Sequence, residues 1–249
     1  MTKRFGFTLA EVLITLGIIG VVAAMTIPTL VKNYQKTVWV NQLKKSVSTL
    51  EQGFQKMLAD DGVDDLLNSE FPYQQGNETD QQYLERTFSK YFNVTKVENL
   101  GDSIWSSYKY LNGEMAEGDS VYGIYLTDGT LLMPFIDGFN DDKILDTIST
   151  RQRTKSLGGK FNSGLTNLYL DINGNKGPNT FGRDCFQFIL AENGHLYPFG
   201  GKDYAIWYVQ KSIDDSNIWY WKNSDSCSNS GSGDLCAGRI IESGWKMDY

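Results

Sequence analysis

The stretch Gly6-Phe7-Thr8-Leu9-Ala10-Glu11-Val12-Leu13-Ile14 opens a nearly unbroken apolar run that continues to about Val31. Two basic residues, Lys3 and Arg4, precede it. A helix of about 25 residues, rising 1.5 Å per residue, is long enough to cross the hydrocarbon core of a bilayer. Its one charged side chain is Glu11, and a carboxylate in hydrocarbon costs about 2.5–3.5 kcal/mol or more. The run therefore predicts a membrane helix with an acid that needs a partner.

Three interpretations of this segment differ in what becomes of the apolar helix. The first interpretation is a plain membrane anchor, although anchors rarely carry an acid near one end. The second is a secretory signal peptide with a small-residue cleavage site at 22–24 before Met25, although Glu11 interrupts the hydrophobic region. The third interpretation is a short leader that is cut between Gly6 and Phe7, which leaves the helix on the mature protein.

The third interpretation is favoured because residues 6–14 closely resemble the N-terminus of type IV prepilins and type II secretion pseudopilins. The resemblance implies that a membrane prepilin peptidase cuts after Gly6 and methylates the new amine of Phe7. Glu11 then becomes the fifth mature residue, which the family keeps acidic, and Pro28 falls where many members carry a helix-kinking proline. It also implies an inner-membrane assembly platform and other pilins or pseudopilins as partners.

Charge pairing gives the resemblance a physical basis. The free amine of Phe7 is a cation at the end of a membrane helix, so Glu11 of a neighbouring subunit can pair with it and offset the cost of an isolated charge. The alternative is that Glu11 lies close enough to the helix end to reach the interface alone.

Composition limits the class of protein further. The chain has 249 residues, 41% hydrophobic and 13% aromatic, with a net charge of −7 and a sequence pI of about 4.8. The hydrophobic and aromatic content supports a folded domain after the helix. The negative net charge disfavours nucleic-acid binding through a basic surface. The basic residues before the apolar run predict a cytoplasmic N-terminus and a translocated bulk.

We expect an α+β fold of pilin-like layout. Its parts are a leader at 1–6, a transmembrane and assembly helix at 7–31, an amphipathic continuation at 32–58 and a globular domain at 59–249. Apolar residues recur every three or four positions in the continuation, which predicts one buried helix face: Trp39, Leu43, Val47, Leu50, Phe54 and Met57. The acidic run 60–65 is interpreted as a solvated loop that ends the helix.

The globular domain is expected to hold an antiparallel sheet of four or five strands that lies on the helix. Alternating patterns and two hairpin turns predict strands at 121–127, 130–136, 166–172, 184–190 and 195–199. Short helices are expected near 80–92 and within the polar segment 139–159. The segment 202–220 is expected to form either a short helix or an irregular aromatic segment. The segment 100–120 has no clear period, and 237–249 is expected to close the domain.

The three cysteines predict one disulfide and one thiol. Cys227 and Cys236 bracket a Ser- and Gly-rich loop that cannot fold by hydrophobic burial, so a disulfide that closes this loop is expected in an oxidising compartment. Zinc is the alternative, but the spacing is wrong and a fourth ligand is not evident. Cys185 lies in an apolar strand pattern and is expected to be a buried thiol.

One loop has the chemistry of a cation site. Asp171, Asn173 and Asn175 alternate like the start of an EF-hand loop, and Asp184 would close a longer loop. Lys176 stands where an EF-hand needs glycine and Gly182 stands where it needs glutamate; some pseudopilins, by resemblance, do carry calcium in the globular domain. The alternative is an ordered Asx-Gly turn without metal.

No motif of an enzyme is present. His195, the single histidine, has no Ser or Cys partner in a nucleophile motif, so a sheet-edge or surface position is expected for it. The predicted function is a structural subunit of a type IV pilus or type II secretion pseudopilus, anchored in the bacterial inner membrane before assembly and found in a periplasmic or cell-surface filament afterwards. The alternative is a membrane-anchored or secreted binding protein or enzyme that never polymerises.

Overall fold

The computed structural model describes residues 6, 8–71, 74–134, 160, 164–209 and 217–249. The chain divides into two compact units, Met1–Val38 and Trp39–Tyr249, which we call the N-terminal unit and the globular unit. Each is considered by itself. The expected polar segment 139–159 lies outside the described residues.

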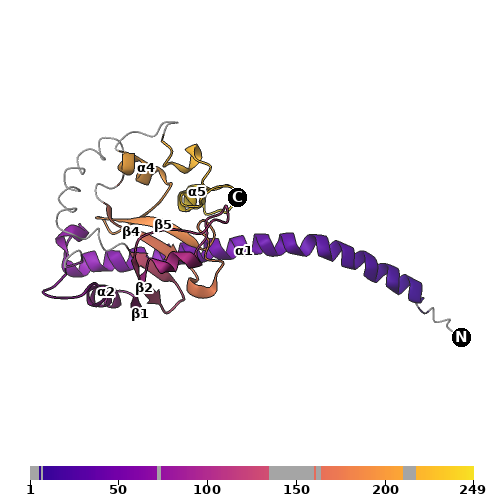
Figure 1. The fold of residues 1–249 in the computed structure, drawn as a ribbon, viewed down its shortest axis with the longest axis horizontal. Helices are drawn as coiled ribbons and strands as arrows, with labels where there is room; N and C mark the ends of the chain where they lie inside the picture. The colour runs from indigo at the N-terminus through magenta and orange to yellow at the C-terminus, as the bar shows by residue number, and fades with distance from the viewer. Residues whose placement is uncertain (1–5, 7, 72–73, 135–159, 161–163, 210–216) are drawn as a thin grey trace. The chain divides into compact units, whose positions relative to one another are not determined.

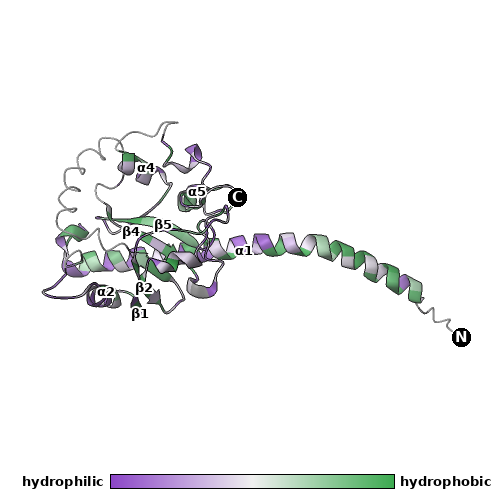
Figure 2. Cartoon of the chain, viewed as in Figure 1, coloured by the Kyte–Doolittle hydropathy of each residue, from purple (hydrophilic) through white to green (hydrophobic). Residues whose placement is uncertain are grey.

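One helix, α1 (Leu9–Asp61), supplies nearly all of the N-terminal unit and the first element of the globular unit (Figure 1). Its first half is mostly hydrophobic (Figure 2), and no residue of its most apolar 18-residue window is buried. By length and composition this helix can cross a membrane. Within this half, the hydroxyls of Thr15 and Thr26 donate to the carbonyls of Glu11 and Val22, so these two polar groups are paired inside the helix.

The proline that was expected to kink the helix does not interrupt it. Pro28 lies inside α1, although it has no N–H to donate to the carbonyl one turn earlier. The helix ends three residues later than the expected boundary at 58. Gly62 follows with φ of +67°, and the amide of Val63 donates to the carbonyl of Leu58, which is a glycine-type helix end beside the acidic run.

The second half of α1 packs as the apolar period predicts. Five of the six expected face residues are buried and Trp39 is partly buried against the same core. This core also contains α2 (Asp80–Ser89), which begins with a capping box between Thr79 and Gln82. Edge-to-face contacts join Phe54 to Phe71 and Phe92, with ring centroids 5.7 and 5.3 Å apart. The amphipathic half is thus held by hydrophobic burial.

The sheet has six antiparallel strands in the order β1-β2-β3-β4-β5-β6, so each strand pairs with the next one in sequence. The strands are β1 (Val94–Gly101), β2 (Val121–Leu126), β3 (Leu131–Pro134), β4 (Gly164–Asp171), β5 (Cys185–Ala191) and β6 (Leu196–Pro198). The five expected strands are present, and within the described residues their ends lie at most two residues from the expected ones. The expected number of four or five was wrong, because the sequence pattern missed β1.

The two faces of the sheet bury different clusters. Leu132 of β3 joins the core that contains α1, whereas its neighbours Leu131 and Met133 join a cluster around Trp105. This division follows from the two-residue period of a strand. Near β6, α4 (Lys202–Val209) supplies Tyr204 to a third cluster. The other elements among the described residues are α5 (Cys236–Glu242) and four short 3-10 helices. These are η1 (Leu66–Asn68), η2 (Ser103–Ser107), η4 (Gly174–Lys176) and η5 (Trp221–Asn223).

Candidate functional site

The carboxylate of Glu11 is engaged within its own chain. The backbone N–H and the hydroxyl of Thr8 both donate to Glu11 Oε2 at 2.8 Å. Thr8 Oγ1 in turn accepts from the Glu11 N–H at 3.3 Å. This is the reciprocal arrangement of a capping box, which satisfies donors at a helix start.

This local role was not predicted from the sequence, although the signal for it is a threonine, Thr8, three residues before Glu11. Gly6 is exposed and precedes the helix, whereas Phe7 lies outside the described residues. The predicted pairing of Glu11 with the amine of another subunit stays a prediction.

The loop between β4 and β5 brings together two of the residues predicted for calcium. The side chains of Asp171 and Asp184 are fully buried. Asp171 accepts from the Tyr108 hydroxyl at 2.6 Å and from the Asn173 N–H at 3.0 Å. Asp184 accepts from the N–H groups of Asn179 and Thr180 at 2.9 and 2.7 Å. Each of the four carboxylate oxygens therefore already holds a hydrogen bond from the chain.

Burial also changes the protonation of these groups. It raises the pKa of Asp171 to about 7, against hydrogen bonds from Tyr108 and Asn173 that lower it. The pKa of Asp184 is raised for the same reason, and the two carboxyl groups repel each other's charge. A proton or a cation would relieve this repulsion.

The fit of the loop to calcium is incomplete. Calcium takes six to eight oxygen ligands, whereas no cluster of three or more His, Cys, Asp or Glu residues able to hold a metal occurs in the described part of the chain. Asn173 Oδ1 and Asn179 Oδ1 are buried without a hydrogen-bond partner, so they are the oxygens available to an ion. Asn175 lies in η4, and its side chain is not among those described. Tyr108 was not predicted to contact this loop, and Asn179 was not among its predicted ligands.

The predicted disulfide is present. Cys227 and Cys236 are bonded, with their Cα atoms 5.4 Å apart, and Cys185 is a buried free thiol. The bond connects the Ser- and Gly-rich loop to the first residue of α5. Arg239 adds a hydrogen bond to the carbonyl of Cys227 at 3.2 Å. The pair therefore attaches a loop of small residues to the buried end of a helix.

His195 has a structural contact and no nucleophile beside it among the described residues. Its Nδ1 lies 3.2 Å from Glu51 Oε1, and Glu51 also accepts from the Leu196 N–H. The contact joins the turn before β6 to α1. The expected surface position beside a strand is confirmed, since half of the histidine side chain is exposed.

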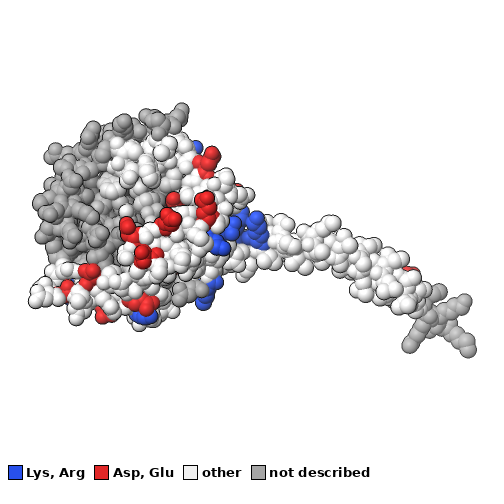
Figure 3. All heavy atoms as spheres, in the orientation of Figure 1, with Lys and Arg blue, Asp and Glu red and all other residues white. Residues whose placement is uncertain are grey.

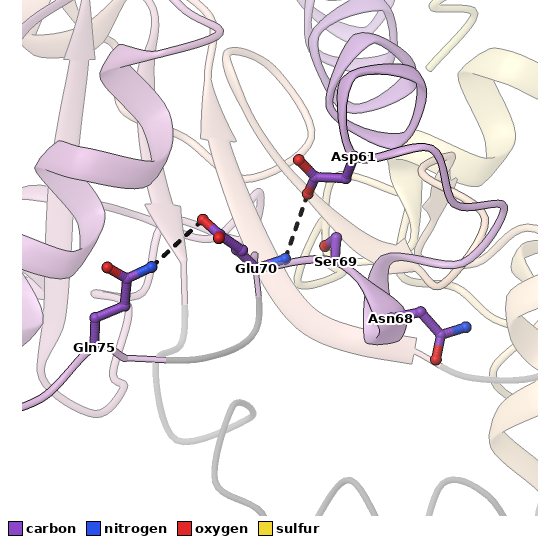
Figure 4. A pocket seen from close by; sticks show the side chains of 5 residues that line it. All are labelled: Asp61, Asn68, Ser69, Glu70 and Gln75. Atoms are coloured by element: carbon purple, nitrogen blue, oxygen red, sulfur yellow. Dashed lines mark hydrogen bonds between the residues drawn. The ribbon is translucent and has the colours of Figure 1, made fainter.

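A polar pocket of about 350 Å³ lies beyond the end of α1 (Figure 4). Its lining residues are Asp61, Asn68, Ser69, Glu70 and Gln75. The N–H of Glu70 donates to Asp61 and the amide of Gln75 donates to Glu70, both at 3.4 Å. Ser69 donates its hydroxyl to the carbonyl of Leu66 at 2.7 Å, so it is not activated as a nucleophile. These contacts organise a turn rather than a reaction centre.

Comparison with known families agrees with the geometry at the N-terminus. Residues 1–27 match the model of the prokaryotic N-terminal methylation motif. No curated protein and no solved structure matches the chain. A long apolar N-terminal helix followed by an antiparallel sheet is a pilin-like α+β fold. The chain carries the methylation motif typical of type IV pilins and pseudopilins, in which an enzymatic role is unusual.

Proposed function

We propose that this protein is a structural subunit of a type IV pilus or a type II secretion pseudopilus. In this proposal a prepilin peptidase cuts after Gly6 and methylates Phe7, and the subunits polymerise through α1. The observation that carries the proposal is the methylation motif at residues 1–27, at the start of a 53-residue helix.

The exposed apolar half of α1 supports membrane anchoring and leaves a surface through which helices of several subunits can pack. Large hydrophobic side chains there are mostly exposed in the single chain, for example Leu13 at 60% and Ile19 at 63%. Burial of such side chains stabilises by roughly 1.5–3 kcal/mol each. Lipid covers them before assembly, which agrees with an inner-membrane anchor, and the helices of other subunits cover them in a filament. The filament then lies in the periplasm or on the cell surface.

The N-terminus of the mature protein tests the proposal. Mass spectrometry of the protein from its native host is expected to find N-methylated Phe7 as the first residue. Gly6→Val is expected to block processing, because a branched side chain crowds the cleavage site. Gly20→Val is the matched control, since a Cβ at position 20 meets no atom within 4 Å in the chain. A mature protein that starts at Met25 would show a conventional signal peptide and overturn the proposal.

A further inference from the structure

We propose that one end of the globular unit docks on the anionic phospholipid headgroups of the membrane that anchors α1. This end, the basic–aromatic end, is defined by Lys44, Trp245 and Lys246. The proposal rests on the membrane-anchoring part of the proposed function and does not depend on polymerisation. It concerns the subunit before assembly, when the globular unit lies beside the bilayer.

A tryptophan and a lysine meet at this end. Lys44 Nζ lies 5.7 Å from the centroid of the Trp245 ring, within cation–π range. Lys44 is exposed, whereas Trp245 packs partly buried against the core that contains α1. A half-buried indole beside a lysine is the pairing typical of a membrane–water interface.

The backbone fixes the position of this tryptophan. Trp245 has φ of +61°, a left-handed conformation that is rare for a bulky residue. The N–H groups of Trp245 and Lys246 both donate to the carbonyl of Ile240, at 2.8 and 3.2 Å. The turn after α5 therefore presents Trp245 and the exposed Lys246 together at one end of the unit.

Charge distribution favours an anionic surface over other occupants. The chain carries a net charge of −7, and the face of the globular unit drawn in Figure 3 shows both basic and acidic atoms. Asp128 and Asp248 are paired with Lys45 and Arg239, at 3.0 and 2.9 Å. Neither Lys44 nor Lys246 forms an ion pair with any residue that the structure describes. Their charges are thus available for phosphate groups.

Chain length keeps this end close to the bilayer. Only residues 32–38 separate the apolar run from Trp39, the first residue of the globular unit. Seven residues reach at most roughly 25 Å in any conformation. Lys44 is five residues beyond Trp39, or about 8 Å along α1. Such a short tether gives the headgroups a high effective concentration at the basic–aromatic end.

Amine acylation in nanodiscs tests the proposal with the full chain. The protein is incorporated into zwitterionic phosphatidylcholine discs and into discs that contain half phosphatidylglycerol. We expect acylation of Lys44 and Lys246 to be at least threefold slower in the anionic discs, and 0.5 M NaCl to remove the difference. Lys56 and Lys176, which are exposed elsewhere on the same unit, serve as internal controls whose rates stay unchanged.

Charge-reversal variants give a second measurement. Hydroxyl-radical oxidation of Trp245 is expected to fall in anionic discs for the wild type and for Lys56→Glu/Lys176→Glu, but not for Lys44→Glu/Lys246→Glu. Equal labelling in both lipids, or an equal loss in the control pair, would overturn the docking. Failure of the chain to enter discs would overturn the anchoring, and with it the docking. Entry into discs without protection would overturn the docking alone.

Discussion

Asp171 shows how a single buried carboxyl group makes the stability of the globular unit depend on pH. Its pKa is about 7 in the folded chain and 3.8 in the unfolded chain. Between these values the folded state binds a proton that the unfolded state does not, so stability falls as pH rises through this range. The groups that face it are Asp184, Tyr108 and Cys185, and burial also favours the uncharged form of each of them.

In a buffer with chelator, we therefore expect a lower melting temperature at pH 8 than at pH 5.5. The difference corresponds to a few kcal/mol at most, since one pKa unit is worth about 1.4 kcal/mol. Asp171→Asn removes the charge with little change of shape and is expected to flatten the profile, as measured by differential scanning calorimetry. A profile as steep in the variant as in the wild type would assign the pH dependence to other groups.

Calcium binding at the same loop is expected to have the opposite effect on the melting temperature at high pH. A ligand that binds only the folded state raises its stability. If calcium binds through Asp171, Asp184 and the orphan oxygen of Asn173, saturating calcium is expected to raise the melting temperature at pH 8. Asp184→Asn is expected to remove the rise, and magnesium provides the ion control. Identical melting curves with calcium and with chelator would leave a loop closed by hydrogen bonds alone.

The sequence could predict part of this loop because Asp171 and Asp184 flank neighbouring strand ends. It could not predict Tyr108, which approaches from a segment 63 residues earlier with no regular period. Nor could it predict that backbone N–H groups would take the carboxylate oxygens, since that depends on the path of the loop. Contacts made by tertiary structure leave no local signal in a sequence.

At the scale of elements, α1 and the turn between α2 and β1 are joined by a close contact that depends on a glycine. A Cβ atom at Gly53 would lie 2.0 Å from Cε1 of Phe92, which itself packs on Phe54 and Phe88. Helix propensity alone favours alanine over glycine by about 1 kcal/mol. Overpacking in a close-packed core costs about 1–3 kcal/mol, so the clash outweighs the propensity.

We therefore expect Gly53→Ala to lower the free energy of unfolding by up to about 2 kcal/mol, the cost of the clash less the gain in helix propensity, as measured by chemical denaturation. Phe92→Leu in the same chain is expected to recover part of the loss, because a smaller side chain makes room for the methyl group. Gly62→Ala is not a suitable control, since its φ of +67° strains any other residue. A neutral or stabilising Gly53→Ala would mean that Phe92 moves aside without cost.

The elements with a strong period were those that the sequence could predict. The buried face of α1 and the paired strands around Asp128-Gly129 and Asn193-Gly194 follow from apolar repeats and hairpin turns. Strand β1 was missed because it is an edge strand whose side chains are mostly polar and partly exposed. Register shifts near both of its ends break the alternation further. Its pairing with β2 comes from the sheet and not from its own pattern.

For the whole molecule, the question is whether Glu11 serves only its own helix or the assembly of many chains. Glu11→Leu removes a charge that costs about 2.5–3.5 kcal/mol in hydrocarbon, so membrane insertion is expected to improve. A simple anchor would work as well or better with this change. A polymerising subunit is expected to be processed normally, to accumulate in the membrane and to be absent from sheared filaments. The reason is that the incoming subunit lacks the carboxylate that pairs with the methylated amine of Phe7.

The capping box supplies the control that separates these two roles. Thr8→Val removes the hydroxyl bond to Glu11 but keeps the carboxylate and the backbone N–H. Loss of a cap costs about 0.5–2 kcal/mol, which weakens the helix start without removing the charge. In cells without wild-type subunit, fractionation into membrane and sheared-filament pools is expected to find Thr8→Val in filaments and Glu11→Asp at an intermediate level. If Glu11→Leu enters filaments as the wild type does, or if Thr8→Val fails as completely, the carboxylate acts only within its own chain.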